Sequence, residues 1–229
     1  MIFGGIQKLS LADYPGHTAA VLFTTSCNMR CGYCHNPELV LPERYAEAIP
    51  LEEVYDFLAK RQGKLDAIAI SGGEPTMHED LPEFVAALKE AGFLVKLDSN
   101  GTHPEMLAQM IAANTIDYIA MDIKGPLHKY SLLAARPIDI DAITRSIKII
   151  LDSGLPHEFR TTIVDGQLSL EDFEDIGAMI KGAQRFAAQK FVPSETINPQ
   201  FMKKSPYTDE EMLQVKQIME KYVDLCVVH

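Results

Sequence analysis

Short apolar segments alternate with longer amphipathic segments along most of this chain, and this alternation constrains the fold more than any other feature. Six segments have the apolar, often β-branched composition of buried strands. They are residues 18–25, 66–70, 93–98, 116–122, 158–164 and 190–192, and the run 223–228 is a candidate terminal strand. Strands that alternate with helices pair in parallel through right-handed crossovers. Six such units predict an α/β fold, either an open or partial barrel or a doubly wound sheet.

Helical periodicity and capping signals occupy the stretches between these strands. Apolar residues recur at i, i+3, i+4 and i+7 from Leu51 and again from Leu81, and a third helix around residues 143–150 ends near Gly154. The expected boundaries are a capping box of Asp80 with Glu83, a stop at Gly92, and N-caps at Ser169 and Thr208. In parallel sheets the chemistry gathers at the C-terminal strand ends, so polar residues there are the candidates for a site.

Length and composition indicate one cytoplasmic domain. A chain of 229 residues, 47% apolar and 23% charged, can bury a substantial core, so we expect a single domain over residues 1–229. No apolar stretch approaches a membrane span, and the N-terminus lacks the basic and apolar regions of a signal peptide. The net charge of −11 argues against a general nucleic-acid-binding surface, which is basic. We therefore expect neither a membrane nor a nucleic acid as partner.

Three of the four cysteines, Cys27, Cys31 and Cys34, fall within eight residues directly after the first predicted strand. In a reducing compartment such a cluster favours metal binding over disulfides. Iron–sulfur clusters are held by cysteine thiolates. A cubane with four irons and three protein ligands keeps one iron open to a small molecule, so the spacing predicts a catalytic cluster. Cys226 lies in an apolar segment and is interpreted as a buried small hydrophobe.

A structural zinc site is an alternative for these cysteines, because His35 is a possible fourth ligand. His35 follows Cys34 directly, however, and adjacent residues rarely both reach one tetrahedral ion. Three ordinary buried thiols are the remaining alternative, and His35 would then be a loop histidine satisfied by its neighbours.

Polar residues also follow the second and third predicted strands. Gly72, Gly73 and Glu74 follow the second, where paired glycines let backbone amides approach a ligand and Glu74 can bind an ammonium group. Asp98 and Asn100 follow the third and are suited to ribose hydroxyls. The plain alternatives are a strand-to-loop turn with a solvated acid, and an Asx turn closed by the next glycine.

The fourth and fifth predicted strands carry Lys124 and Arg160. Lys124 lies two residues after Asp122, so an ion pair at a strand end is an equal alternative to a ligand contact. Arg160 lies within the fifth strand, ahead of a turn at residues 165–166. Together with the earlier strand ends, these groups are expected to converge on one face.

The combined motifs resemble the signature of radical S-adenosylmethionine enzymes. The Cys27-x3-Cys31-x2-Cys34 run, with the aromatic Tyr33 before its last cysteine, is similar to the family's cluster motif. Residues 71–75 resemble the family's Gly-Gly-Glu motif, and residues 98–101 resemble its ribose-contacting strand end. The resemblance implies a partial (β/α)6 TIM-type barrel with parallel strands. It also implies two cofactors, a [4Fe–4S] cluster on the three cysteines and S-adenosylmethionine.

The same resemblance implies a role for each candidate residue. In that family the reduced cluster cleaves S-adenosylmethionine to methionine and a 5′-deoxyadenosyl radical, which abstracts a hydrogen atom from the substrate. The implied contacts are Tyr33 near the adenine, Gly72, Gly73 and Glu74 at the methionine amine, Asp98 and Asn100 at the ribose, and Lys124 and Arg160 at the carboxylate or ribose.

A narrower resemblance concerns the substrate. Residues 5–16, 34–38 and 121–124 are similar to glycyl-radical-enzyme activating enzymes, with the strongest likeness to anaerobic ribonucleoside-triphosphate reductase activating proteins. This implies a glycine of a partner glycyl radical enzyme as the hydrogen donor. It also implies a flavodoxin- or ferredoxin-type electron donor.

Two other functions are compatible with part of this pattern. A radical enzyme acting on a small molecule, such as a 7-carboxy-7-deazaguanine synthase-like enzyme, would carry the same cofactor motifs. A non-catalytic iron–sulfur electron carrier would need the cysteines alone. The carrier gives no reason for the polar residues at successive strand ends.

Overall fold

The computed structural model describes residues 1–229. Its strands follow one another in sequence order from β1 to β8, and its contacts divide the chain into two compact units. The first unit consists of Met1–Asn28, Asn36–Ser99 and His103–Ile119, and the second of Met29–His35, Asn100–Thr102 and Ala120–His229. An α/β fold with parallel strands is thus confirmed. It has eight strands, and the candidate terminal strand at residues 223–228 is present as Leu225–Val228. The single domain over residues 1–229 stays a prediction.

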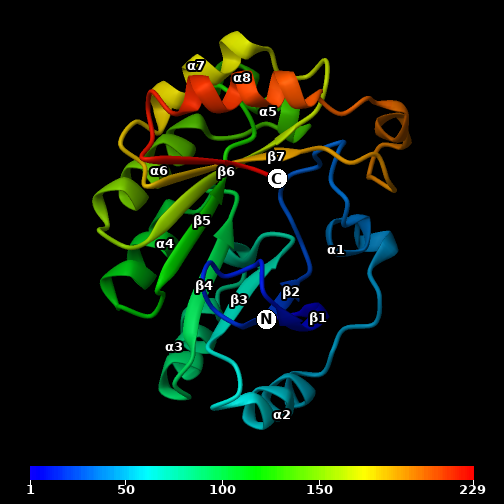
Figure 1. Ribbon diagram of the computed structural model, residues 1–229. Coiled ribbons are helices and arrows are strands. Elements are labelled where there is room, and N and C mark those ends of the chain that lie inside the picture. The colour runs from blue at the N-terminus through cyan, green and yellow to red at the C-terminus, as the bar shows by residue number, and fades with distance from the viewer. The chain divides into compact units, whose positions relative to one another are not determined.

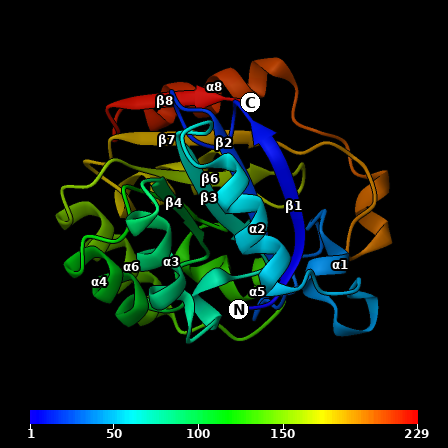
Figure 2. The same ribbon diagram turned by 90° about the horizontal axis from the view of Figure 1, so that it is seen from below.

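The first unit contains one antiparallel strand and three strands that pair in parallel. β1 (Phe3–Ser10) pairs antiparallel with β2 (Ala19–Thr24), and β2, β3 (Ala67–Gly72) and β4 (Leu94–Ser99) pair in parallel. Its helices are α1 (Pro37–Val40), α2 (Leu51–Arg61), α3 (Leu81–Glu90) and α4 (Pro104–Ala112), with the 3₁₀ turns η1 (Pro42–Arg44) and η2 (Pro75–Met77). α3 and α4 lie side by side (Figures 1 and 2).

β5 (Tyr118–Asp122) begins in the first unit and continues into the second. In the second unit β6 (His157–Ile163), β7 (Arg185–Lys190) and β8 (Leu225–Val228) pair in parallel. The helices there are α5 (Tyr130–Ala134), α6 (Ile140–Asp152), α7 (Leu170–Met179) and α8 (Asp209–Met219), with η3 (Leu127–Lys129) and η4 (Pro199–Lys203). α7 and α8 pack on each other, and α8 also packs on β7 and β8 (Figure 1).

The core of each unit is formed by its parallel strands. In the first unit β2 is fully buried from Ala19 to Leu22, and in the second Phe159 and Phe186 are fully buried in neighbouring strands. Near-continuous apolar runs of this kind are typical of parallel strands covered on both faces. No helix is both long enough and apolar enough to cross a membrane.

Several predicted helix boundaries are confirmed. Thr208 caps α8 in a capping box, and Ser169 begins α7 with its amide donating to the Asp172 carboxylate over 2.7 Å. Gly92 has a φ of +88° just after α3, as a stop residue requires. The capping box at Asp80 was wrong, because that side chain makes no cap hydrogen bond and pairs with the Met1 ammonium instead.

Two strands differ from the prediction. β1 was not predicted, because the Phe-Gly-Gly-Ile-Gln-Lys-Leu-Ser sequence has too few β-branched residues, and its pairing with β2 forms it nevertheless. The strand expected at residues 190–192 is instead Arg185–Lys190. Its Ala-Ala-Gln centre has little strand propensity, and parallel pairing with both β6 and β8 overrides that preference.

Candidate active site

The exit of β2 and the end of β3 are hydrogen-bonded to each other in the first unit. The Gly73 amide donates to the Thr24 carbonyl over 2.8 Å, and the Glu74 amide donates to the Ser26 carbonyl over 2.7 Å. A Cβ on Gly73 would lie only 1.9 Å from the Ser26 carbonyl oxygen, so this close approach requires glycine. The contact places Glu74 next to the backbone that leads into Cys27.

Gly72 is required by the same approach. Its φ is +112°, and a Cβ there would lie 2.4 Å from the Thr24 carbonyl oxygen. The two glycines therefore have a structural role, which is to bring β3 against the exit of β2. The Gly73 amide donates to protein, so its approach to a ligand stays a prediction.

Glu74 is a buried carboxylate with a fixed orientation. It is 1% exposed, and its Oε1 accepts from the Thr76 amide over 3.1 Å, from the Thr76 hydroxyl, and from the Ser99 hydroxyl over 3.0 Å. Hydrogen bonds of this kind offset the cost of burying a polar group. Neither Thr76 nor Ser99 was predicted, although short hydroxyl residues beside a buried acid are a usable signal.

Asp98 is also held by neighbours from the first unit. Its Oδ1 accepts from the Lys96 ammonium over 2.7 Å, and its Oδ2 accepts from the Ser71 hydroxyl over 2.9 Å. Lys96 is only 2% exposed, and its Nζ lies 5.9 Å from the ring centroid of Tyr118. The sequence analysis missed Lys96. A lysine two residues before an acid in an apolar strand shares its face, and was the available signal.

The second unit contains the rest of the cysteine loop. Cys31 and Tyr33 are 5% and 6% exposed. Burial raises the pKa of the Cys31 thiol, and the nearby Lys124 ammonium and Tyr33 hydroxyl act in the opposite direction. The Tyr33 hydroxyl is buried and makes no hydrogen bond of standard geometry. A buried phenol in contact with a thiol fits a site in which that sulfur becomes an accepting thiolate.

Lys124 and Arg160 both bind Asp122. The Lys124 Nζ lies 3.2 Å from Asp122 Oδ2, and the Arg160 Nε donates to Oδ1 over 2.9 Å. Burial alone would raise the pKa of Asp122, but the two cations outweigh burial and lower it below its usual value. The ion-pair alternative for Lys124 is therefore present. Contacts of either cation with a cofactor stay a prediction.

Asn100 lies in a turn of the second unit. Its Oδ1 accepts from the amide and the hydroxyl of Thr102, over 3.1 and 2.7 Å. Gly101 follows with a φ of +79°. The Asx turn that was the alternative interpretation is thus formed, and a ribose contact for Asn100 stays a prediction.

His35 and Cys226, the other two residues considered in the sequence analysis, have ordinary environments. The His35 ring stacks on Phe191 with centroids 5.2 Å apart, and its Nε2 lies 3.0 Å from the Val192 carbonyl oxygen. His35 is therefore a satisfied loop histidine. Cys226 is 1% exposed, and burial raises its pKa to about 11, which confirms a buried small hydrophobe.

All four cysteines are free thiols. Cys27 belongs to the first unit, and Cys31 and Cys34 belong to the second. No three side chains of His, Cys, Asp or Glu are grouped as a metal site in the structure. Thiols free of disulfides are the donors that an iron–sulfur cluster needs, and the assignment of these three as its ligands stays a prediction.

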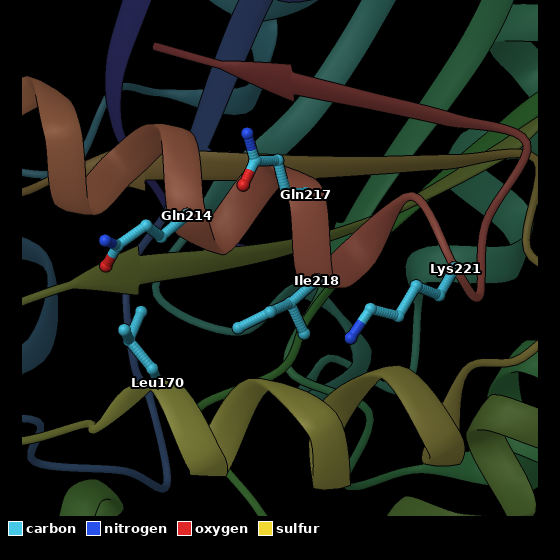
Figure 3. Close-up of a pocket in the computed structure, with 5 residues that line it drawn as sticks. All are labelled: Leu170, Gln214, Gln217, Ile218 and Lys221. Atoms are coloured by element: carbon cyan, nitrogen blue, oxygen red, sulfur yellow. The ribbon is translucent and has the colours of Figure 1, made fainter.

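A cavity of about 330 Å³ lies between α7 and α8 of the second unit (Figure 3). It is lined by Leu170, Gln214, Gln217, Ile218 and Lys221. The Lys221 ammonium pairs with Glu174 over 2.6 Å. None of the predicted site residues lines this cavity.

The family follows from a sequence comparison. The profile of the Radical SAM superfamily matches residues 21–180, which include the cysteines of the loop and the strand ends described above. The chain belongs to the radical SAM superfamily. The cofactors of this superfamily are a [4Fe–4S] cluster and S-adenosylmethionine.

Several curated relatives are named as activating enzymes, and one, from Pyrococcus horikoshii, as a probable GTP 3',8-cyclase. "Putative glycyl-radical enzyme activating enzyme MJ1227" of Methanocaldococcus jannaschii is 37% identical over 99% of this chain and 95% of its own length. The pyruvate formate-lyase-activating enzyme of Staphylococcus aureus is 31% identical over 42% of this chain and 39% of its own.

Solved structures of radical SAM proteins share the fold. Streptococcus suis SuiB bound to S-adenosylmethionine is 16% identical, with a TM-score of 0.65 over 91% of this chain and 51% of that one. The coproporphyrinogen III oxidase of Escherichia coli has a TM-score of 0.62 at 14% identity, over 90% and 52% of the two chains. At these identities the likeness extends to the fold alone, and this chain spans about half of each.

Proposed function

We propose that this protein cleaves S-adenosylmethionine at a [4Fe–4S] cluster ligated by Cys27, Cys31 and Cys34, and that it activates a glycyl radical enzyme. The observation that carries the proposal is the hydrogen bond from the Glu74 amide to the carbonyl of Ser26, the residue before Cys27. It joins the Gly-Gly-Glu motif to the start of the cysteine loop within one unit. When bound, the reduced cluster and S-adenosylmethionine would supply methionine and a 5′-deoxyadenosyl radical.

The side chains of this protein bind and orient the cofactor. Glu74, buried and fixed through Oε1, binds the methionine amine by a charge-assisted hydrogen bond. Lys124 and Arg160, which both pair with Asp122, are proposed to contact the methionine carboxylate, because cationic side chains suit that group. The remaining proposed contacts are Tyr33 at the adenine, Gly72 and Gly73 at the methionine amine, and Asp98 and Asn100 at the ribose.

The proposed substrate is a glycine in a partner glycyl radical enzyme, with anaerobic ribonucleotide reductase as the first candidate. The support is the named activity of the curated relatives and the likeness of residues 5–16 and 34–38 to activating enzymes. The chemistry that the bound cofactors would supply at this glycine is removal of a hydrogen atom from its Cα, which would leave a glycyl radical in the partner. A flavodoxin- or ferredoxin-type protein of the cytoplasm would supply the electron.

The first experiment tests the cluster. Protein reconstituted under anaerobic conditions should bind about four irons per chain and, once reduced, convert S-adenosylmethionine to 5′-deoxyadenosine. Cys31→Ser should abolish both, because serine does not replace the thiolate ligand. Cys226→Ser is the matched control, since this cysteine lies buried in β8, and it should keep the iron and the cleavage. Full activity in Cys31→Ser would contradict the assigned ligands.

The second experiment separates Glu74 and the partner from the cluster. Glu74→Gln keeps an oxygen for Thr76 and Ser99 but removes the charge, so S-adenosylmethionine should bind at least tenfold more weakly with the iron content unchanged. Unchanged affinity would remove Glu74 from the site. Incubation with candidate partners should give a glycyl radical signal in paramagnetic resonance. Cleavage without that signal in any partner would favour a small-molecule substrate.

A further inference from the structure

A segment far along the chain donates hydrogen bonds to the backbone of the cysteine loop. We define the support segment as residues 191–201, between β7 and the centre of η4. Its Ile197 amide donates to the Cys34 carbonyl and its Asn198 amide donates to the Gly32 carbonyl, each over 3.0 Å. These two bonds fix the carbonyls on both sides of Tyr33, in the part of the loop that contains Cys31 and Cys34.

Aromatic contacts reinforce the two backbone bonds. A Cβ on Gly32 would lie 2.5 Å from Cε2 of Phe201, so the Phe201 ring lies directly against the Gly32 backbone. The same ring lies 6.3 Å from the Tyr33 ring and 6.4 Å from the Phe191 ring, measured between centroids. His35 adds its stack on Phe191, described above. Rings of the segment and rings of the loop thus pack together in one continuous row.

A third backbone bond holds the loop from α5. The Arg30 amide donates to the Ala134 carbonyl over 2.8 Å. Residues 30–35 are therefore fixed at the start by α5 and at the end by the support segment. Without these bonds the loop would be ordered only when the cluster binds, and the loss of conformational entropy would weaken binding.

We propose that the support segment is a positioning element for the cluster, and that the Phe201 ring against Gly32 is its central contact. The segment holds the residues from Cys31 to Cys34 in the ligating conformation before the cluster binds, and slows cluster loss afterwards. Its residues contact the loop backbone and not the cluster. The inference rests on the proposed function for the identity of the bound group, and on the contacts of the second unit for the rest.

The test compares two neighbouring positions of η4. Phe201→Ala removes the ring against Gly32, whereas Met202→Ala removes a side chain that is 52% exposed. Both proteins are reconstituted anaerobically, and the transfer of iron to a chelator is followed over time. Phe201→Ala should release iron at least tenfold faster than the unchanged protein, and Met202→Ala within twofold of it. Phe201→Leu should restore part of the difference, because it returns apolar volume.

Hydrogen exchange supplies a readout that needs no cluster. In the iron-free protein the amides of Ile197 and Asn198, which donate to the loop carbonyls, should exchange at least tenfold faster in Phe201→Ala than in Met202→Ala, with unfolding midpoints in urea compared alongside. Equal iron release and equal exchange in the two variants would overturn the proposal. If Phe201→Ala does not fold, Gly32→Ala tests the same contact from the loop side. Unchanged protein that takes up no iron contradicts the proposed function, and the exchange data then decide this inference alone.

Discussion

The buried ion pair between Lys96 and Asp98 makes a quantitative prediction for Lys96→Met. The Lys96 side chain is 2% exposed and that of Asp98 is 11% exposed, with 2.7 Å between Nζ and Oδ1. Methionine has a similar length and no charge, so the substitution removes the cation with little change in volume. The Ser71 hydroxyl would still donate to the buried Asp98 carboxylate.

The expected loss is large because the carboxylate stays buried. Removing one partner of a buried ion pair costs about 3–5 kcal/mol. The contact of Lys96 with the Tyr118 ring, about 2 kcal/mol for a desolvated cation, is lost as part of the same change. Replacing both partners removes the unpaired charge. The double variant Lys96→Met, Asp98→Leu should therefore be more stable than Lys96→Met alone, by about 2 kcal/mol or more.

Urea unfolding of the iron-free protein, followed by circular dichroism, measures these differences. Lys148→Met is the control, because Lys148 pairs with Asp152 on the exposed face of α6, with side chains 77% and 63% exposed. That pair should contribute about 0.5 kcal/mol or less. A loss below about 1 kcal/mol for Lys96→Met, or additive effects of the two substitutions, would refute the reasoning.

Three further predictions concern stability. Gly73→Ala forces a Cβ onto the Ser26 carbonyl oxygen and should lower the free energy of unfolding by about 2–3 kcal/mol in urea titrations. A loss under about 0.5 kcal/mol, which is the error of such titrations, would contradict this close approach. Thr208→Ala removes the N-cap of α8 and should lower the free energy of unfolding by about 1 kcal/mol in the same assay. An unchanged free energy of unfolding would show that the cap does not stabilise the protein. Burial lowers the pKa of His78 and His103 below the ordinary 6.5, so the unfolded chain protonates first and stability falls as the pH drops below that value. Thermal melts between about pH 7 and 5 should show this slope, and glutamine at both positions should flatten it.

Local signals in the sequence indicated much of the candidate site and correctly predicted several helix ends. The cysteine spacing, the Gly-Gly-Glu run and the acid that ends β4 are contiguous motifs, so they needed no knowledge of distant contacts. The caps at Ser169 and Thr208 also depend only on residues three positions apart. Asp80 shows the limit of such signals, because its carboxylate pairs with the Met1 ammonium, far away in the sequence, and does not cap the helix.

Features that depend on distant residues were not predictable in this way. β1 and β7 lack strand propensity and form through pairing with neighbours. The contacts of Phe201 with Gly32 and Tyr33 join segments that share no sequence signal, because rings pack by shape and area.

The separation between the cysteine loop and its support segment has a consequence for synthesis in the cell. His35 and Val192, which lie in contact, are 157 residues apart in the chain. At about 5–20 residues per second, a ribosome takes roughly 8–30 s to add that stretch. During this interval the emerging thiols lack their support. Cluster insertion is therefore expected only after β7 and the segment behind it have been translated.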